Sequence, residues 1–212
     1  MKIAIVAYGY LESALVPEIS GSDFIIGVDK GAYWLLSHSV KPNIAIGDFD
    51  STTPRELKVI KKKVSDIRAF QSEKDQTDLD LATDHAISLK PKEVVIYGAI
   101  GNRFDHTLIA INLLEKFLKR NINARIRNRH NEIFLLTSRR TILKSLRYTY
   151  VSILPYSSKS VVTLRSVLYP VTKHTFYKNS SLGVSNEIVG KRAEIIVHSG
   201  IVLVIQSRDG SK

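Results

Sequence analysis

The first 127 residues alternate short apolar runs with helical patterns, whereas the rest of the chain carries strand patterns and no long helical period. Runs rich in Ile and Val predict strands of a parallel sheet that is covered on both faces. Their alternation with helical patterns favours an α/β domain with a mostly parallel sheet and flanking helices. The expected strands are 3–7, 24–28, 44–46 and 94–97, and the expected helices are 33–39, 54–64, 79–89 and 108–118.

The second half reads as short segments rich in Val, Ile, Thr and Tyr that are separated by turn signals. This pattern predicts an all-β domain, either a sandwich or a small barrel. The boundary falls between residues 127 and 145, and we take the domains as 1–127 and 128–212. The expected strands are 132–137, 149–154, 160–164, 192–198 and 201–206.

Composition narrows the protein class. The chain has 212 residues, is 44% hydrophobic and lacks cysteine, which excludes disulfides, thiolate zinc sites and a cysteine nucleophile. No segment approaches the ~18 apolar residues of a membrane helix, and residues 3–7 are read as a first strand rather than a signal peptide. We therefore expect a cytoplasmic protein with no membrane partner.

The net charge of +11 is concentrated in the second half of the chain. Residues 1–106 carry 13 Lys and Arg against 15 Asp and Glu, whereas residues 107–212 carry 18 against 5. A basic half suggests a polyanionic partner, either a nucleic acid or a phosphorylated small molecule. Solubility alone is the other explanation.

The first of three acidic clusters follows the expected strand 44–46. Asp48 and Asp50 lie two residues apart at the carboxyl end of that strand, where ligands bind in open α/β sheets. Two such carboxylates can share one Mg²⁺ ion. The alternative is a solvated turn in which Asp50 or Ser51 caps the next helix.

The second cluster enters the expected helix 79–89. Asp75 and Asp78 lie beside Lys74 at the helix entrance, a combination that suits a metal–phosphate complex. Thr77 and Asp80 have the spacing of a capping box, so we assign Asp80 a structural role. Simple complementarity to the helix dipole is the alternative for each carboxylate taken alone.

The third cluster lies between the expected strand 94–97 and the next helix. Its two glycines allow close backbone approach, Arg103 offers a planar donor for phosphate, and Asp105 adds a carboxylate. His106 is either a base or a structural histidine. Neither a P-loop nor a dinucleotide-binding fingerprint is present. Together the three clusters suggest a magnesium-dependent phosphoryl or nucleotidyl transfer site.

The chain resembles the thiamine pyrophosphokinase (thiamin diphosphokinase) family in several motifs that follow one another in the same order. The resemblance covers essentially the whole chain and extends to the plan of an α/β half and a β half. The motifs are Val28-Asp29-Lys30-Gly31-Ala32, Gly47-Asp48-Phe49-Asp50-Ser51, Lys74-Asp75-Gln76-Thr77-Asp78, Gly98-x-x-Gly-x-Arg103-x-Asp105-His106 with Asn112, and Gly183-Val184-Ser185-Asn186-Glu187.

The resemblance implies transfer of diphosphate from ATP to thiamine, giving thiamine diphosphate and AMP, with Mg²⁺ as cofactor. It implies a homodimer whose thiamine pocket lies between the β domain of one subunit and the α/β domain of the other. By the resemblance, the catalytic residues are Asp48, Asp50, Asp75 and Asp105, and the first three of these bind the metal. The residues expected to bind ATP and the cofactor are Asp29, Ser51, Lys74, Thr77, Asp78, Arg103 and His106. The residues expected to bind thiamine are Gln71, Ser185 and Asn186.

Some positions depart from the family pattern. Asn102 stands where a second glycine is common, Tyr8-Gly9-Tyr10 replaces the more usual paired glycines, and Asn128 stands where an aspartate is frequent. None of these changes removes an expected metal ligand.

Two other functions compete with this interpretation. Another magnesium-dependent phosphotransferase or a pyrophosphohydrolase would use the same acidic edge without needing Ser185 and Asn186. A nucleic-acid-binding module would use the basic β half, where tyrosines accompany the basic residues, but no known RNA-binding signature is present. We therefore expect no nucleic acid partner.

Overall fold

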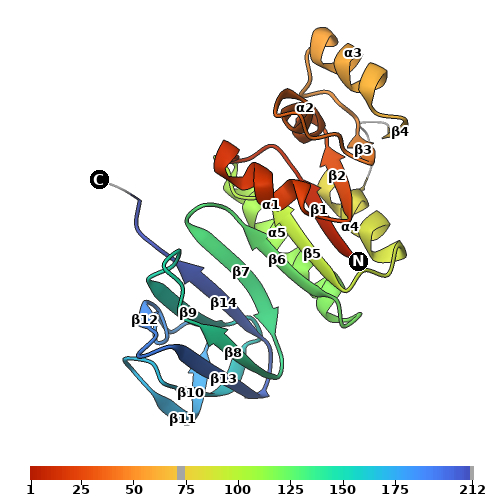
Figure 1. The fold of residues 1–212 in the computed structure, drawn as a ribbon. Coiled ribbons are helices and arrows are strands. Elements are labelled where there is room, and N and C mark those ends of the chain that lie inside the picture. Colours follow the sequence, from red (N-terminus) through yellow and green to blue (C-terminus); the bar gives the residue numbers. More distant parts are fainter. Residues whose placement is uncertain (71–74, 211–212) are drawn as a thin grey trace. The chain divides into compact units, whose positions relative to one another are not determined.

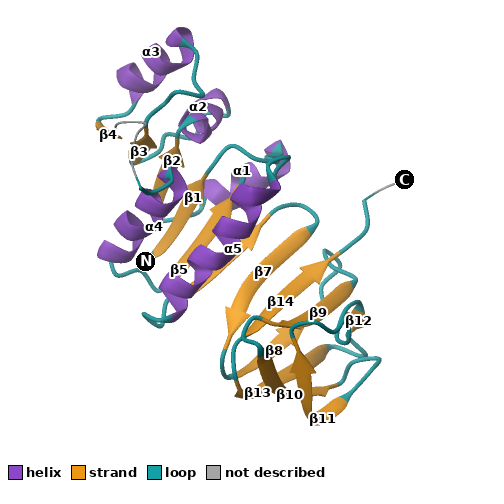
Figure 2. Cartoon of the chain, turned by 180° about the vertical axis from the view of Figure 1, so that it is seen from behind, coloured by secondary structure: helices purple, strands orange, loops and turns teal. Residues whose placement is uncertain are grey.

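The computed structural model describes residues 1–70 and 75–210, and its chain forms two compact units, Met1–Arg129 and His130–Lys212 (Figure 1). The first unit contains a parallel sheet with helices on both faces, and the second consists of strands (Figure 2). The predicted fold class is thereby confirmed. Among the described residues, no helix combines the length and the apolar character needed to cross a membrane.

Six parallel strands form the sheet of the first unit, in the order β6-β5-β1-β2-β3-β4. Residues on β1, β2 and β5 that are almost fully buried form its core, which explains their continuous apolar runs. The strands are β1 (Lys2–Val6), β2 (Phe24–Val28), β3 (Ile44–Gly47), β4 (Asp66–Ala69), β5 (Glu93–Tyr97) and β6 (Asn123–Arg127). The helices are η1 (Ser13–Leu15), α1 (Val16–Ser20), α2 (Lys30–Ser37), α3 (Pro54–Lys63), α4 (Asp78–Ser88) and α5 (Phe104–Leu118).

The second unit contains two groups of antiparallel strands, β12-β9-β14-β7 and β11-β10-β13-β8. One apolar core draws on both groups, for example Phe134, Ile153, Leu164 and Ile195. This packing is that of a sandwich. The strands are β7 (Asn131–Leu136), β8 (Arg139–Leu143), β9 (Tyr150–Pro155), β10 (Lys159–Arg165), β11 (Val171–Tyr177), β12 (Asn186–Glu187), β13 (Arg192–Ser199) and β14 (Val202–Ser207).

Threonine caps begin the two helices that follow the acidic loops. Thr53 and Glu56 form a complete capping box at α3, with Pro54 in the first turn. Thr77 accepts a hydrogen bond of 3.2 Å from the backbone N–H of Asp80 at α4. The carboxylate of Asp80 instead contacts Lys116 on α5, so it joins two helices.

Replacing Asp80 with Ala should destabilise the protein by up to about 1 kcal/mol and leave turnover nearly unchanged. The loss arises because Lys116 would keep only its 2.8 Å contact with Asp84. Urea unfolding and steady-state turnover of the same preparation check this expectation. A collapse of turnover at unchanged stability would contradict the structural role of Asp80.

Candidate active site

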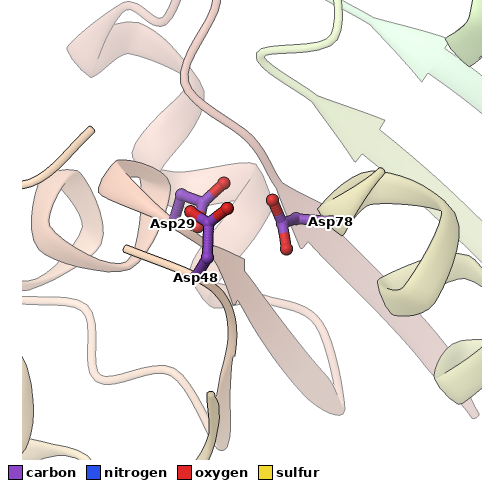
Figure 3. Close-up of side chains that lie close together, drawn as sticks. All are labelled: Asp29, Asp48 and Asp78. Carbon is purple, nitrogen blue, oxygen red and sulfur yellow. The ribbon is translucent and has the colours of Figure 1, made fainter. Parts of the chain in front are cut away.

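Three carboxylates meet at the carboxyl edge of the parallel sheet. Asp29 follows β2, Asp48 follows β3, and Asp78 is the first residue of α4. One oxygen from each side chain lies within 4.8 Å of an oxygen of the other two. Figure 3 shows the three groups turned toward one another, with Asp78 reaching across from the start of its helix. We call these three residues the acidic cluster.

An unusual backbone places Asp29 next to Asp48. Asp29 and Phe49 both have left-handed φ angles, 46° and 60°, which non-glycine residues adopt only when their surroundings impose them. The N–H of Asp29 donates to Ile46 O at 3.0 Å, and the N–H of Phe49 donates to Asp29 Oδ1 at 3.1 Å. At Gly47, φ is 154° and an added Cβ would lie 1.8 Å from Asp29 Oδ1. Glycine is therefore required at the last position of β3.

The acidic cluster carries negative charge that burial and proximity make costly. Burial, followed by the neighbouring charge of Asp78, raises the pKa of Asp29 to about 7, despite the N–H donated by Phe49. The pKa of Asp50 is also raised, chiefly by its side-chain hydrogen bond with Asp48 and the charge of that group. Closely spaced carboxylate oxygens that repel one another are the donor set that Mg²⁺ prefers. The residues present therefore fit a divalent cation.

The remaining predicted metal ligands, Asp50 and Asp75, are exposed and lie outside the acidic cluster. The N–H of Asp50 donates to Asp48 Oδ1 at 3.0 Å, so Asp50 stays adjacent to it. Phe49, which separates the two aspartates, is buried in a left-handed conformation. The backbone between the two aspartates is therefore not extended, yet their side chains still interact.

The start of α5 carries exposed charged groups, Arg103 at the N-cap and Asp105 and His106 in the first turn. Arg103 Nη2 lies 2.7 Å from Asp105 Oδ2, and His106 Nε2 lies 4.0 Å from the same oxygen. The hydrogen bond from Arg103 lowers the pKa of Asp105. All three side chains are more than half exposed, so they are accessible to an anionic ligand.

The other predicted site residues that the structure describes in the first unit lie outside the acidic cluster. Ser51 is exposed in the turn before α3, and Thr77 is the N-cap of α4. Gln71 and Lys74 lie outside the described residues.

A separate cavity of about 470 Å³ lies in the second unit. Its volume falls within the range of small-molecule sites. Apolar and small polar side chains line it, including Tyr169, Phe176, Leu182, Val184 and Asn186. Gly183, also in the wall, has a φ of 97° and lies so close to Ile153 O that an added Cβ would be 2.4 Å away.

Asn186 organises the wall of this cavity. Its Oδ1 accepts from the backbone N–H groups of Tyr169 and Glu187, each at 3.0 Å, and its Nδ2 donates to Tyr169 O at 3.0 Å. The residue is buried, whereas Ser185 is exposed, has a φ of 56° and donates its N–H to Ser152 Oγ. The amide of Asn186 is thus largely used in holding Tyr169, which favours a positioning role over direct hydrogen bonding to a ligand.

Replacing Asp29 with Asn should stabilise the metal-free protein at about pH 8 by up to roughly 2 kcal/mol, after allowance for solvent screening. Asp29 binds its proton more tightly in the folded than in the unfolded chain. Its contribution to stability is therefore complete below about pH 4 and is lost as the pH rises toward 7. Urea unfolding with a chelator at about pH 5 and pH 8 measures this; identical pH dependence in the wild type and the variant would contradict it.

The family resemblance gives Asp29 and Asp78 roles in ATP and cofactor binding, and the pattern at the entrance of α4 also indicates a metal–phosphate complex near Asp78. The sequence does indicate a ligand-binding position for Asp29, because Asp29 follows a buried apolar strand as Asp48 does. For Asp78, the signal was its place in the first turn of a helix. The cavity wall at Tyr169 and Leu182 carries no comparable signal, since single exposed apolar residues are common.

Comparisons with known proteins match both units. The model of the thiamin pyrophosphokinase catalytic domain matches residues 17–126, and that of the thiamin pyrophosphokinase vitamin B1 binding domain matches residues 139–202. The chain is 37% identical to thiamine pyrophosphokinase of Bacillus subtilis over 201 residues, which cover 92% of this chain and 94% of the relative.

Solved structures agree with these matches. The crystal structure of thiamine pyrophosphokinase from Bacillus subtilis has a TM-score of 0.93 at 36% identity, covering 99% of this chain and 100% of that one. The enzyme from Geobacillus thermodenitrificans has a TM-score of 0.89 at 31% identity, covering 100% and 99%. The acidic cluster lies within the part of the chain that matches the catalytic domain.

Proposed function

The chain belongs to the thiamin pyrophosphokinase family, and we propose that its acidic cluster holds Mg²⁺ and the phosphates of ATP during diphosphate transfer to thiamine. The enzyme converts ATP and thiamine to AMP and thiamine diphosphate. The observation that carries the proposal is the convergence of Asp29, Asp48 and Asp78 within 4.8 Å in the catalytic part of the chain. Asp50, bonded to Asp48, adds a further carboxylate at the rim.

Positioning and charge neutralisation account for most of the chemistry in reactions of this class. When bound, Mg²⁺ would neutralise charge on the phosphates. The hydroxyl oxygen of thiamine bonds to the β-phosphorus of ATP, AMP leaves with the bridging oxygen, and a carboxylate of this edge takes the hydroxyl proton. Exposed Arg103 supplies a planar donor for phosphate, and its ion pair with Asp105 orients it. Lys74 and His106 complete the proposed phosphate-binding set.

We assign thiamine to the cavity of the second unit, in the part of the chain that matches the vitamin B1 binding domain. Tyr169, Phe176 and Val184 offer apolar surface for the rings. Ser185 supplies an exposed hydroxyl, and Asn186 fixes the wall. Gln71 remains a proposed thiamine contact.

The family resemblance leads us to propose a cytoplasmic homodimer with shared active sites. In such a dimer, the acidic cluster of one subunit and the cavity of the other would form one site. Mixing Asp78→Asn protein, which should be nearly inactive, with Asn186→Ala protein tests it, in assays at thiamine concentrations well below the KM of both. If each site uses residues from two subunits, mixed dimers should recover part of the activity, because one of their two sites carries neither lesion. No recovery, with subunit exchange verified independently, would exclude shared sites.

Thermal unfolding with Mg²⁺ and ATP tests the metal assignment without relying on turnover. The ligands should raise the Tm of the wild type, because they bind only the folded protein. Asp48→Asn should lose most of this increase, whereas Asp84→Asn, on α4 and bound to Lys116, should retain it. An equal increase in both variants would contradict the acidic cluster as the binding site.

A further inference from the structure

The strand order changes direction at β1. From β1 the chain builds β2, β3 and β4 on one side and then places β5 and β6 on the other, so β1 and β5 flank the topological switch point. Ligands of open α/β sheets bind at the carboxyl edge of such a point. The loops that leave these two strands are joined by backbone hydrogen bonds of 2.7 Å, from Gly9 N–H to Gly98 O and from Tyr10 N–H to Ile100 O.

Two half-exposed tyrosine rings lie on the loop after β1. Tyr8 is 52% exposed and Tyr10 is 54% exposed. The hydroxyl of Tyr10 donates to Asn102 Oδ1, one residue before Arg103. The ammonium of Lys30, the residue after Asp29, lies 5.0 Å from the centre of the Tyr8 ring. The loop after β1 thus contacts Asn102, which precedes Arg103, and Lys30, which follows Asp29.

This arrangement unites two departures from the family pattern. Asn102 replaces a glycine and Tyr10 replaces a residue of the paired glycines, and their side chains are bonded to each other. The bond restrains an aromatic ring that would otherwise rotate freely at the surface. An exposed ring held in one orientation provides a preformed surface for a flat ligand, because its ordering cost is already met.

We propose that the nucleobase of ATP stacks on Tyr10, which thereby favours nucleotides over inorganic polyphosphates. The proposal rests on the proposed function, since it extends the site from the triphosphate to the nucleoside. Every nucleobase has a π-face, and stacking therefore tolerates different bases. The enzyme should accordingly distinguish ATP from inorganic tripolyphosphate strongly and ATP from GTP weakly.

Calorimetric titration of the full-length protein with Mg²⁺ and either ATP or tripolyphosphate tests this role. Tyr10→Ala should weaken ATP binding about ten-fold and leave tripolyphosphate binding unchanged. Tyr10→Phe keeps the ring but loses its bond to Asn102, so it should give a smaller, intermediate loss. Asn102→Gly, which frees the ring, should give an intermediate loss. Tyr177→Ala is the matched control, because Tyr177 is 56% exposed on β11 and does not line the cavity.

Wild-type affinity for ATP in Tyr10→Ala, or an equal loss of both ligands, would overturn the stacking role. Failure of the proposed function gives a different result: Asp48→Asn would then bind both ligands as the wild type does. A Tm within the experimental error of the wild type in each tyrosine variant establishes that an altered affinity does not reflect unfolding.

Discussion

Replacing Asp78 with Asn should reduce turnover by at least about 100-fold, because the acidic cluster loses one of the three charges that face the proposed metal and phosphates. The free energy of unfolding should change by less than about 1 kcal/mol. Loss of a negative charge at the start of α4 is unfavourable, but removal of its repulsion with Asp29 offsets that loss. Steady-state turnover and urea unfolding of one preparation measure both quantities.

Asp84→Asn is the matched control for that change. Asp84 lies on the same helix and contacts Lys116 Nζ at 2.8 Å rather than the acidic cluster. Its variant should keep near-normal turnover and lose at most about 1 kcal/mol of stability. Near-normal turnover in Asp78→Asn, or an equal loss of turnover in both variants, would contradict the assignment.

Replacing Asn186 with Ala should raise the KM for thiamine about ten-fold, equivalent to about 1.4 kcal/mol, without changing the KM for ATP. The variant loses three hydrogen bonds of 3.0 Å, two of which hold the backbone of Tyr169 at the cavity wall. Leaving buried backbone groups unpaired should also cost roughly 1–3 kcal/mol of stability. Kinetics with each substrate varied in turn, together with urea unfolding, measure these effects.

Ser160→Ala separates the effect on the cavity from a general loss of stability. Ser160 is buried in the same unit, and its hydroxyl donates to Ile201 O at 2.9 Å, but it does not line the cavity. Its variant should lose stability by a similar mechanism and keep the KM for thiamine. If both variants raise that KM equally, Asn186 acts only through overall stability.

The fold was predictable where burial imposes a clear pattern on the sequence. The strands β1, β2, β3 and β5 are continuously apolar because both faces of the sheet are covered. Strands β4, β6, β8, β11 and β12 were not predicted. Each is short or carries charged and polar residues that interrupt any apolar run. The choice between sandwich and barrel was also open, since strand patterns do not specify which strands pair.

The sequence predicted which loops form the candidate site. It predicted less well which side chains in those loops lie together. Sequence position placed Asp48 at the edge of the sheet, but it could not show that Asp29 and Asp78 are the residues whose carboxylates gather around it. The approach of Asp78 to Asp29 depends on how α4 packs against the sheet, which no local pattern encodes. The contact between Tyr10 and Asn102 joins positions 92 residues apart, so the two departures could not be recognised as a pair.

The identity of the products tests the central claim most directly. Purified protein is incubated with Mg²⁺ and ATP, with and without thiamine, and the nucleotides and thiamine esters are separated and quantified. We predict AMP and thiamine diphosphate in equal amounts, formed only when thiamine is present. Release of ADP with thiamine monophosphate, or of AMP and pyrophosphate without thiamine, would contradict diphosphate transfer at this site.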